Sequence, residues 1–140
     1  MSDQVYYHVV FTVWRGRPAL NGEIETYFHE LVRQIARQRG YLILAMETMP
    51  NHVHILLAKL PWENLSDIVK NIKGATARYI FQKYPDLRLD MKSNHLWTRG
   101  FEYVKHDEAS LPTVSAYIRN QKTKYAVPVK WQGDEIPARE

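Results

Sequence analysis

Apolar and polar residues follow two different spacings along the chain, and the change of spacing separates predicted strands from predicted helices. Aromatic and β-branched residues fill residues 6–14, which predicts a first strand, and a loop with glycine and proline at 15–18 would end it. From residue 23 to residue 39 the apolar positions recur at steps of three and four, as in an amphipathic helix. Gly40 follows a basic last turn, which is typical of a helix C-terminus.

Two further strands are predicted at residues 42–49 and 52–59. Pro50 and Asn51 between them are a turn signal short enough to make an antiparallel hairpin. Ser66 is a suitable cap for a second helix, which should run until Tyr84 and Pro85 stop it. A loop of mixed charge at residues 86–94 then leads to a late strand at residues 101–104. A third helix is predicted at about residues 111–125.

This order of strand, helix, strand, strand, helix, strand and helix predicts the α+β class, with helices packed on an antiparallel sheet in a ferredoxin-like layout. The 140 residues fit a single domain spanning 1–140, in which residues 128–140 are expected to form a poorly ordered tail because they lack periodicity. Folds of this class host many functions, so the function has to be inferred from the side chains of a site.

The charge of the chain favours a polyanionic partner. Its 19 lysines and arginines outnumber its 15 aspartates and glutamates, giving a net charge of +4. Acidic residues concentrate in the first helix and the tail. Basic residues fill the middle of the chain and surround the third helix, at Lys70, Lys73, Arg78, Lys83, Arg88, Lys92, Arg99, Lys105, Arg119, Lys122 and Lys124.

No apolar run approaches the roughly 20 residues that cross a bilayer, so we expect no membrane partner. The amino terminus has neither a basic start nor an apolar signal region, and the chain contains no cysteine. These observations lead us to expect a cytoplasmic protein.

The segment around His52 and His54 is the most informative in the chain. Successive side chains of a strand alternate between its faces, so the two imidazoles should project together while Val53, Ile55 and Leu57 project the other way into apolar packing. Two convergent imidazoles are half of a metal site. Polar residues on a solvated strand face alternate in the same way, so this pair needs a second feature before it indicates chemistry.

The second feature is the pair Tyr117 and Gln121, which stand four residues apart in a helical context and therefore share one helix face. Glutamine offers a carbonyl oxygen as a third metal ligand, and tyrosine offers a phenol that can attack a phosphorus atom. Tyr125 lies a further four residues along the same face. Spacing alone does not choose between the two tyrosines.

Together these segments resemble the HUH single-tyrosine transposases, in particular the small members of the insertion-sequence family 200/605. That family has a strand motif of histidine, apolar residue and histidine, as at residues 52–54 here, and a tyrosine followed four residues later by glutamine, as at Tyr117 and Gln121. The resemblance covers most of the chain, in blocks at residues 7–11, 72–76, 96–101 and 117–121.

The resemblance implies that Tyr117 is the catalytic nucleophile and that His52, His54 and Gln121 bind a divalent metal, Mg²⁺ or Mn²⁺. The implied activity is DNA transposition, in which single-stranded DNA is cut and rejoined at the ends of an insertion sequence through a 5′-phosphotyrosine intermediate. Recognition of DNA hairpins and action as a homodimer are implied as well. Asn51 departs from the pattern, since many relatives have an acidic residue there, but this leaves the metal ligands intact.

Three alternatives stay open. An HUH replication initiator or relaxase uses the same histidine pair and tyrosine, although its chains are typically longer. A noncatalytic, transposase-derived DNA-binding protein would keep the basic surface around an idle site, and the presence of all four site residues argues against it. A metal-dependent hydrolytic nuclease would differ in leaving no product attached to the protein.

Other residues compete for these roles. His8, His95 and His106 are scattered over predicted strands and loops, where single histidines are more often hydrogen-bonded structural residues than metal ligands. Trp97 and Phe101 are suited to stacking on bases, although packing in the core is at least as good an explanation for both.

Overall fold

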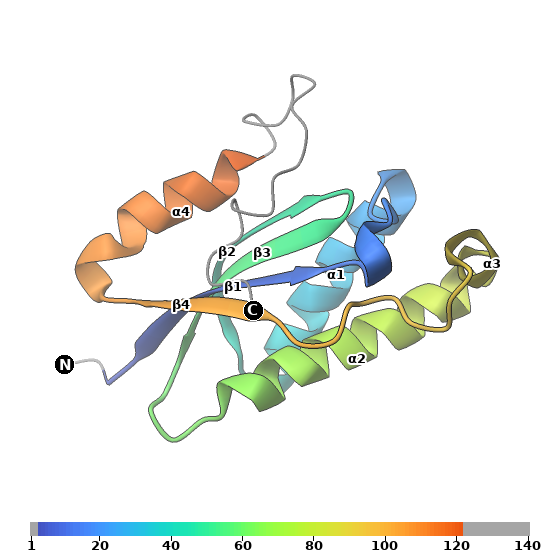
Figure 1. The fold of residues 1–140 in the computed structure, drawn as a ribbon. Helices are drawn as coiled ribbons and strands as arrows, with labels where there is room; N and C mark the ends of the chain where they lie inside the picture. The colour runs from blue at the N-terminus through green and yellow to red at the C-terminus, as the bar shows by residue number, and fades with distance from the viewer. Residues whose placement is uncertain (1–2, 122–140) are drawn as a thin grey trace.

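A hairpin of two eight-residue strands forms one half of the sheet in the computed structural model, which describes residues 3–121. β2 (Leu42–Met49) and β3 (His52–Lys59) are antiparallel and have the predicted bounds. β1 (Val5–Thr12) pairs with the other side of β3, and β4 (Glu102–His106) pairs with β1. The sheet order is therefore β2-β3-β1-β4, with all neighbours antiparallel (Figure 1).

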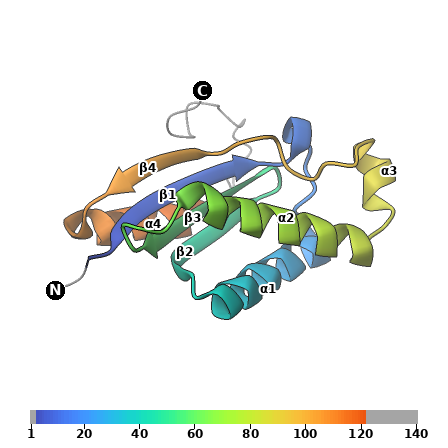
Figure 2. The same cartoon turned by 90° about the horizontal axis from the view of Figure 1, so that it is seen from below.

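Helices cover both faces of this sheet. α1 (Gly22–Arg39) and α2 (Leu65–Lys83) lie side by side on one face, whereas α4 (Leu111–Arg119) lies on the other (Figures 1 and 2). This arrangement confirms the predicted α+β class, an antiparallel sheet with helices packed on it. No helix within residues 3–121 is long and apolar enough to span a bilayer.

The two faces of β3 carry different side chains because successive residues of a strand point to opposite sides. Val53 and Ile55 belong to the main core, which lies beneath α1 and α2. His52 and His54 lie on the opposite face. α4 packs on that face through a small apolar cluster formed by Ala45, Leu56, Val114 and Ile118.

The first strand and the second helix differ from their predicted bounds. β1 ends at Thr12 because a 3₁₀ turn, η1 (Trp14–Gly16), follows, in which Arg15 adopts a left-handed backbone with φ of 55°. α2 begins before Ser66, since the side chain of Asn64 accepts a hydrogen bond from the Asp67 amide and caps the helix instead.

The region predicted as a loop at 86–94 contains the short helix α3 (Leu87–Met91). Its two end residues are four positions apart and both buried, so they fix one turn of helix against the core. A second 3₁₀ turn, η2 (Glu108–Ser110), leads from β4 into α4. The predicted end of the third helix at residue 125, Tyr125 itself and the predicted tail at 128–140 lie outside the described residues.

Candidate active site

The alternation of β3 places both motif histidines on the face that α4 covers. His52 and His54 are 1% and 0% exposed, and their ring centroids lie 5.0 Å apart. Their convergence on one face agrees with the interpretation from sequence. Their burial is not predicted by the sequence pattern. The two imidazoles are shielded from water and do not lie on a solvated strand face.

A hydrogen bond to one ring nitrogen orients each of these imidazoles. Asn51 Oδ1 lies 2.8 Å from His52 Nδ1 and accepts a hydrogen bond from it. The proton of the neutral ring is then on Nδ1, and the buried Nε2 atom of His52 carries the lone pair. His54 Nδ1 lies 2.9 Å from Nε2 of His8. When His54 donates in that bond, its own buried Nε2 atom keeps a lone pair as well. Both rings then offer the same type of nitrogen to a ligand.

The protonation states of His52 and His8 suit a metal site. Burial lowers the pKa of His52 to about 4. Burial, together with the nearby His106, also lowers the pKa of His8 to about 4. Both imidazoles are therefore neutral at neutral pH, and neutral imidazole is the form that binds a metal and accepts a hydrogen bond.

α4 brings Tyr117 to this histidine pair. The Tyr117 ring centroid lies 6.2 Å from that of His54 and 6.1 Å from that of His8, and the side chain is 36% exposed. Val114 and Ile118 fix the helix by packing against the sheet, and this turns Tyr117 toward the rings. The structure thus brings together His54 and Tyr117, which are more than 60 residues apart in sequence.

Gln121 follows on the next turn of the chain after Tyr117 and is fully buried. Its Nε2 atom donates to the Tyr117 carbonyl at 3.2 Å, whereas its Oε1 atom is buried and has no hydrogen-bond partner among residues 3–121. A buried acceptor without a donor is unfavourable unless a cation or water satisfies it. Two imidazole nitrogens and this oxygen are a donor set that suits a divalent metal.

Three residues near the site were not predicted to take part. The sequence favours His8 as a hydrogen-bonded structural histidine, and its bond to His54 makes it a support for the site. Asn51 departs from the family pattern in sequence, and in the structure it orients His52. Glu102 is buried and lies in register with Val10, which also pairs with His54, so its carboxylate shares that face of the sheet.

Comparisons with known proteins give the chain a family. Residues 1–121 match the family model described as IS200-like transposase. The ISDra2 transposase TnpA of Deinococcus radiodurans is 34% identical over 121 residues, and the match covers 86% of each chain. The transposase of insertion sequence element IS200 from Salmonella typhimurium is 26% identical over 115 residues, which cover 82% of this chain and 75% of the relative.

Solved structures agree with this assignment. A crystal structure of a Deinococcus radiodurans protein assigned as a transposase superposes with a TM-score of 0.70 at 30% identity, covering 86% of this chain and 93% of that one. The REP-associated tyrosine transposase, solved bound to a REP hairpin, gives a TM-score of 0.62 at 15% identity over 89% of this chain and 70% of that one. The latter likeness concerns the fold alone.

The chain therefore belongs to the family of IS200-like transposases. Proteins of this family are enzymes of DNA transposition, so the chain is a DNA-binding protein of a mobile element. This agrees with the family resemblance in the sequence.

Proposed function

We propose that this transposase cuts and rejoins single-stranded DNA at the ends of an insertion sequence, with Tyr117 as the nucleophile. The observation that carries the proposal is the position of Tyr117, whose ring lies 6.2 Å from that of buried His54 while more than a third of its side chain reaches solvent. A DNA strand can therefore approach the phenol from outside while the histidines lie behind it.

The proposed step conserves the energy of the bond that is broken. The Tyr117 oxygen forms a bond to phosphorus as the bond from phosphorus to the 3′ oxygen breaks. The phenol loses a proton and the 3′ oxygen gains one, so the products are a 5′-phosphotyrosine and a 3′-hydroxyl. A different 3′-hydroxyl can then attack the phosphotyrosine and release Tyr117, which rejoins strands without ATP.

A divalent cation, Mg²⁺ or Mn²⁺, would be held by the Nε2 atoms of His52 and His54 and by Oε1 of Gln121. The buried Oε1 atom and the neutral imidazole of His52 support this assignment. When bound, such an ion withdraws charge from the scissile phosphate and orients it for in-line attack. Asn51 and His8 would keep the two imidazoles in the tautomer that binding requires.

The proposed DNA substrate carries a hairpin beside a single-stranded flank, and the proposed acting unit is a homodimer. The resemblance to single-tyrosine transposases implies both, and the similarly folded REP-associated enzyme is described as bound to a REP hairpin. The net charge of +4 supports a polyanionic partner. Paired geometry would fix the register of the DNA while the flank reaches Tyr117.

Labelled single-stranded DNA carrying an end of the element tests this proposal. Wild-type protein should give a protein–DNA adduct that resists denaturation. Mn²⁺ should support adduct formation at least as well as Mg²⁺, because manganese accepts imidazole ligands more readily. EDTA should stop adduct formation. His54→Ala should abolish the adduct, whereas Tyr103→Phe, which alters an exposed tyrosine on β4, should leave it unchanged. Undiminished adduct formation in EDTA would remove the metal from the mechanism.

A further inference from the structure

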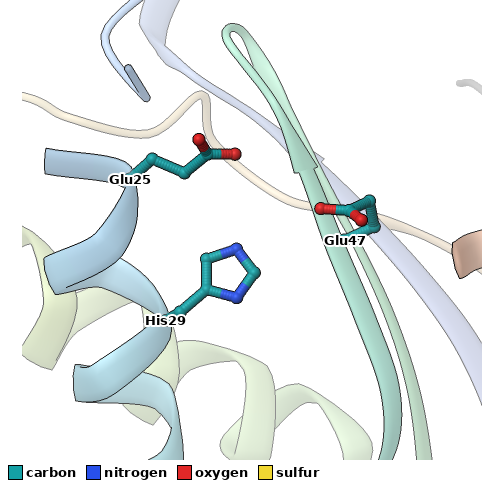
Figure 3. Close-up of side chains that lie close together, drawn as sticks. All are labelled: Glu25, His29 and Glu47. Carbon is teal, nitrogen blue, oxygen red and sulfur yellow. The ribbon is translucent and has the colours of Figure 1, made fainter. Parts of the chain in front are cut away.

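A second group of ligand-type side chains lies between α1 and β2, at the edge of the sheet that β2 forms. Glu25 and His29 are four residues apart on α1 and therefore share one face of that helix, and Glu47 comes from β2. One ligand atom from each residue lies within 4.8 Å of the other two. Figure 3 shows the two carboxylates and the imidazole turned toward a common space between helix and strand.

Thr48 holds this group in place from the buried side. Its hydroxyl, which is fully buried, donates to Glu25 Oε2 and lies 2.9 Å from His29 Nε2. Its backbone amide donates to Glu47 Oε1 at 3.0 Å. One residue therefore contacts all three side chains and positions them.

The donor set has the chemistry of a transition-metal site. One imidazole nitrogen and two carboxylate oxygens suit Zn²⁺ or Mn²⁺, and two carboxylates balance the charge of a divalent ion. At bonds of about 2.1 Å, the ligand atoms of a tetrahedral site lie about 3.4 Å apart. The three ligand atoms, which now lie within 4.8 Å of one another, would therefore have to move closer together by small side-chain adjustments. Glu25, His29 and Glu47 are each partly exposed, which gives an ion a path from solvent and the side chains room to adjust.

We propose that Glu25, His29 and Glu47 form a second divalent-cation site, for Zn²⁺ or Mn²⁺, with a structural role. An ion there would tie α1 to β2, an edge strand of the sheet. Glu47 pairs with His54 across the hairpin, so the ion would also stiffen the strand next to the one that carries the histidine pair. This site does not depend on the proposed catalytic role of Tyr117.

Zinc binding can be measured separately at each site by calorimetric titration and by native mass spectrometry of the full chain. His54→Ala protein should still bind one Zn²⁺. Adding Glu25→Gln and Glu47→Gln should weaken that binding by about a hundredfold or more, since two of three ligands lose their charge. The control Glu23→Gln with Glu30→Gln alters exposed glutamates of the same helix and should have no effect. Failure of His54→Ala protein to bind zinc, or binding that ignores Glu25 and Glu47, would overturn the proposal.

Two further measurements protect the test from a variant that does not fold. Wild-type protein should bind two zinc ions, and the Glu25→Gln, Glu47→Gln variant should bind one. A single ion in both wild-type and His54→Ala protein would contradict the site at the histidine pair but would agree with the site at Glu25, His29 and Glu47. In wild-type protein the NMR signals of the His29 ring should move on addition of Zn²⁺. Unmoved His29 signals at saturating zinc would refute the site.

The structural role has its own readout in the resistance of the protein to unfolding. A ligand that binds only the folded state at a hundred times its Kd lowers the unfolding constant about a hundredfold. Zinc should do so in His54→Ala protein but not after Glu25→Gln and Glu47→Gln are added. Equal stabilisation of both proteins by zinc would contradict a tie between α1 and β2.

Discussion

The Asn51 side chain decides which nitrogen of His52 faces the site. Its Oδ1 atom accepts from Nδ1, and the buried Nε2 atom is then the one with the lone pair. An acidic residue at this position, as the family resemblance leads one to expect, would accept the same hydrogen bond with a negative charge. Asparagine retains the orienting acceptor without that charge, so the departure from the pattern changes the basicity of His52 rather than its geometry.

Asn51→Ala should therefore raise the Mn²⁺ concentration needed for half-maximal adduct formation by about 10- to 100-fold, the usual effect of losing a partner of a metal-binding histidine. Asn51→Asp keeps an acceptor for His52 Nδ1, so it should need no more Mn²⁺ than wild type. The measurement is adduct yield against Mn²⁺ concentration, with Asn94→Ala, an exposed asparagine, as the control. An unchanged requirement in Asn51→Ala would show that Asn51 does not orient His52.

At the residue scale, strand alternation was sufficient to predict that His52 and His54 converge. The contribution of His8 was not predictable in the same way. It is 46 residues from His54 in sequence, and only the pairing of β1 with β3 brings the two rings within hydrogen-bonding distance. The burial of the histidine pair likewise depends on α4, whose position on the sheet no local pattern encodes.

At the scale of elements, Lys73 connects α2 to the segment that precedes β4. Its Nζ atom donates to the carbonyl oxygens of Thr98 and Gly100. From sequence it was grouped with the basic residues that face a polyanion, and its neighbour Lys70 is indeed exposed. The structure gives Lys73 an internal role, and burial lowers its pKa to about 8.

Lys73→Met should lower the free energy of unfolding by about 1–3 kcal/mol, because two carbonyl groups lose their donor. The difference in the free energy of unfolding between wild type and Lys73→Met should increase between pH 8 and pH 10.5. In that range the unfolded wild-type chain binds more protons than the folded one, so raising the pH favours the folded state of wild type but not of the variant. Urea unfolding at pH 7.5 and pH 10 measures this, with Lys70→Met as control. A difference that narrows with pH would contradict the role assigned to Lys73.

Regular elements were predictable where a long periodic pattern exists. The hairpin strands and α1 agree with prediction to within one residue, because alternation and helical spacing each extend over eight residues or more. α3 was missed since a single turn anchored by Leu87 and Met91 has no period to detect. Asn64 and Ser66 are both good caps, and only the observed hydrogen bond to Asp67 distinguishes them.

At the scale of the whole molecule, the order of elements predicted the layout of the sheet but not the placement of α4. α1 and α2 cover one face with a large core, and α4 packs on the other face through the small cluster of Ala45, Leu56, Val114 and Ile118. This asymmetry leaves room for polar chemistry on the α4 face. The pairs Tyr117–His54 and Tyr117–His8 are a consequence of that placement and thus of the tertiary fold.

Binding of DNA should depend on both charge and shape. In Tyr117→Phe protein, which should not cleave DNA, affinity should fall with salt by a log–log slope of about −0.7 to −0.9 for each phosphate contact. Lys70→Ala or Arg78→Ala, which remove exposed cations of α2, should each reduce the slope by about one contact. A hairpin with a single-stranded flank should outcompete unstructured DNA of equal length. Equal affinities for the hairpin and for unstructured DNA, at both of two salt concentrations, would instead indicate a nonspecific polyanion binder.

If Tyr117 forms the covalent bond to DNA, the residue that carries the DNA after reaction can be identified chemically. After reaction with single-stranded DNA and Mn²⁺, the protein is denatured, digested with protease and nuclease, and the modified peptide is sequenced by mass spectrometry. We expect a nucleotide linked through its 5′-phosphate to Tyr117, and no such peptide from Tyr117→Phe protein. Linkage to Tyr125 or another tyrosine, or complete cleavage without any linked peptide as expected of a hydrolytic nuclease, would contradict this role of Tyr117.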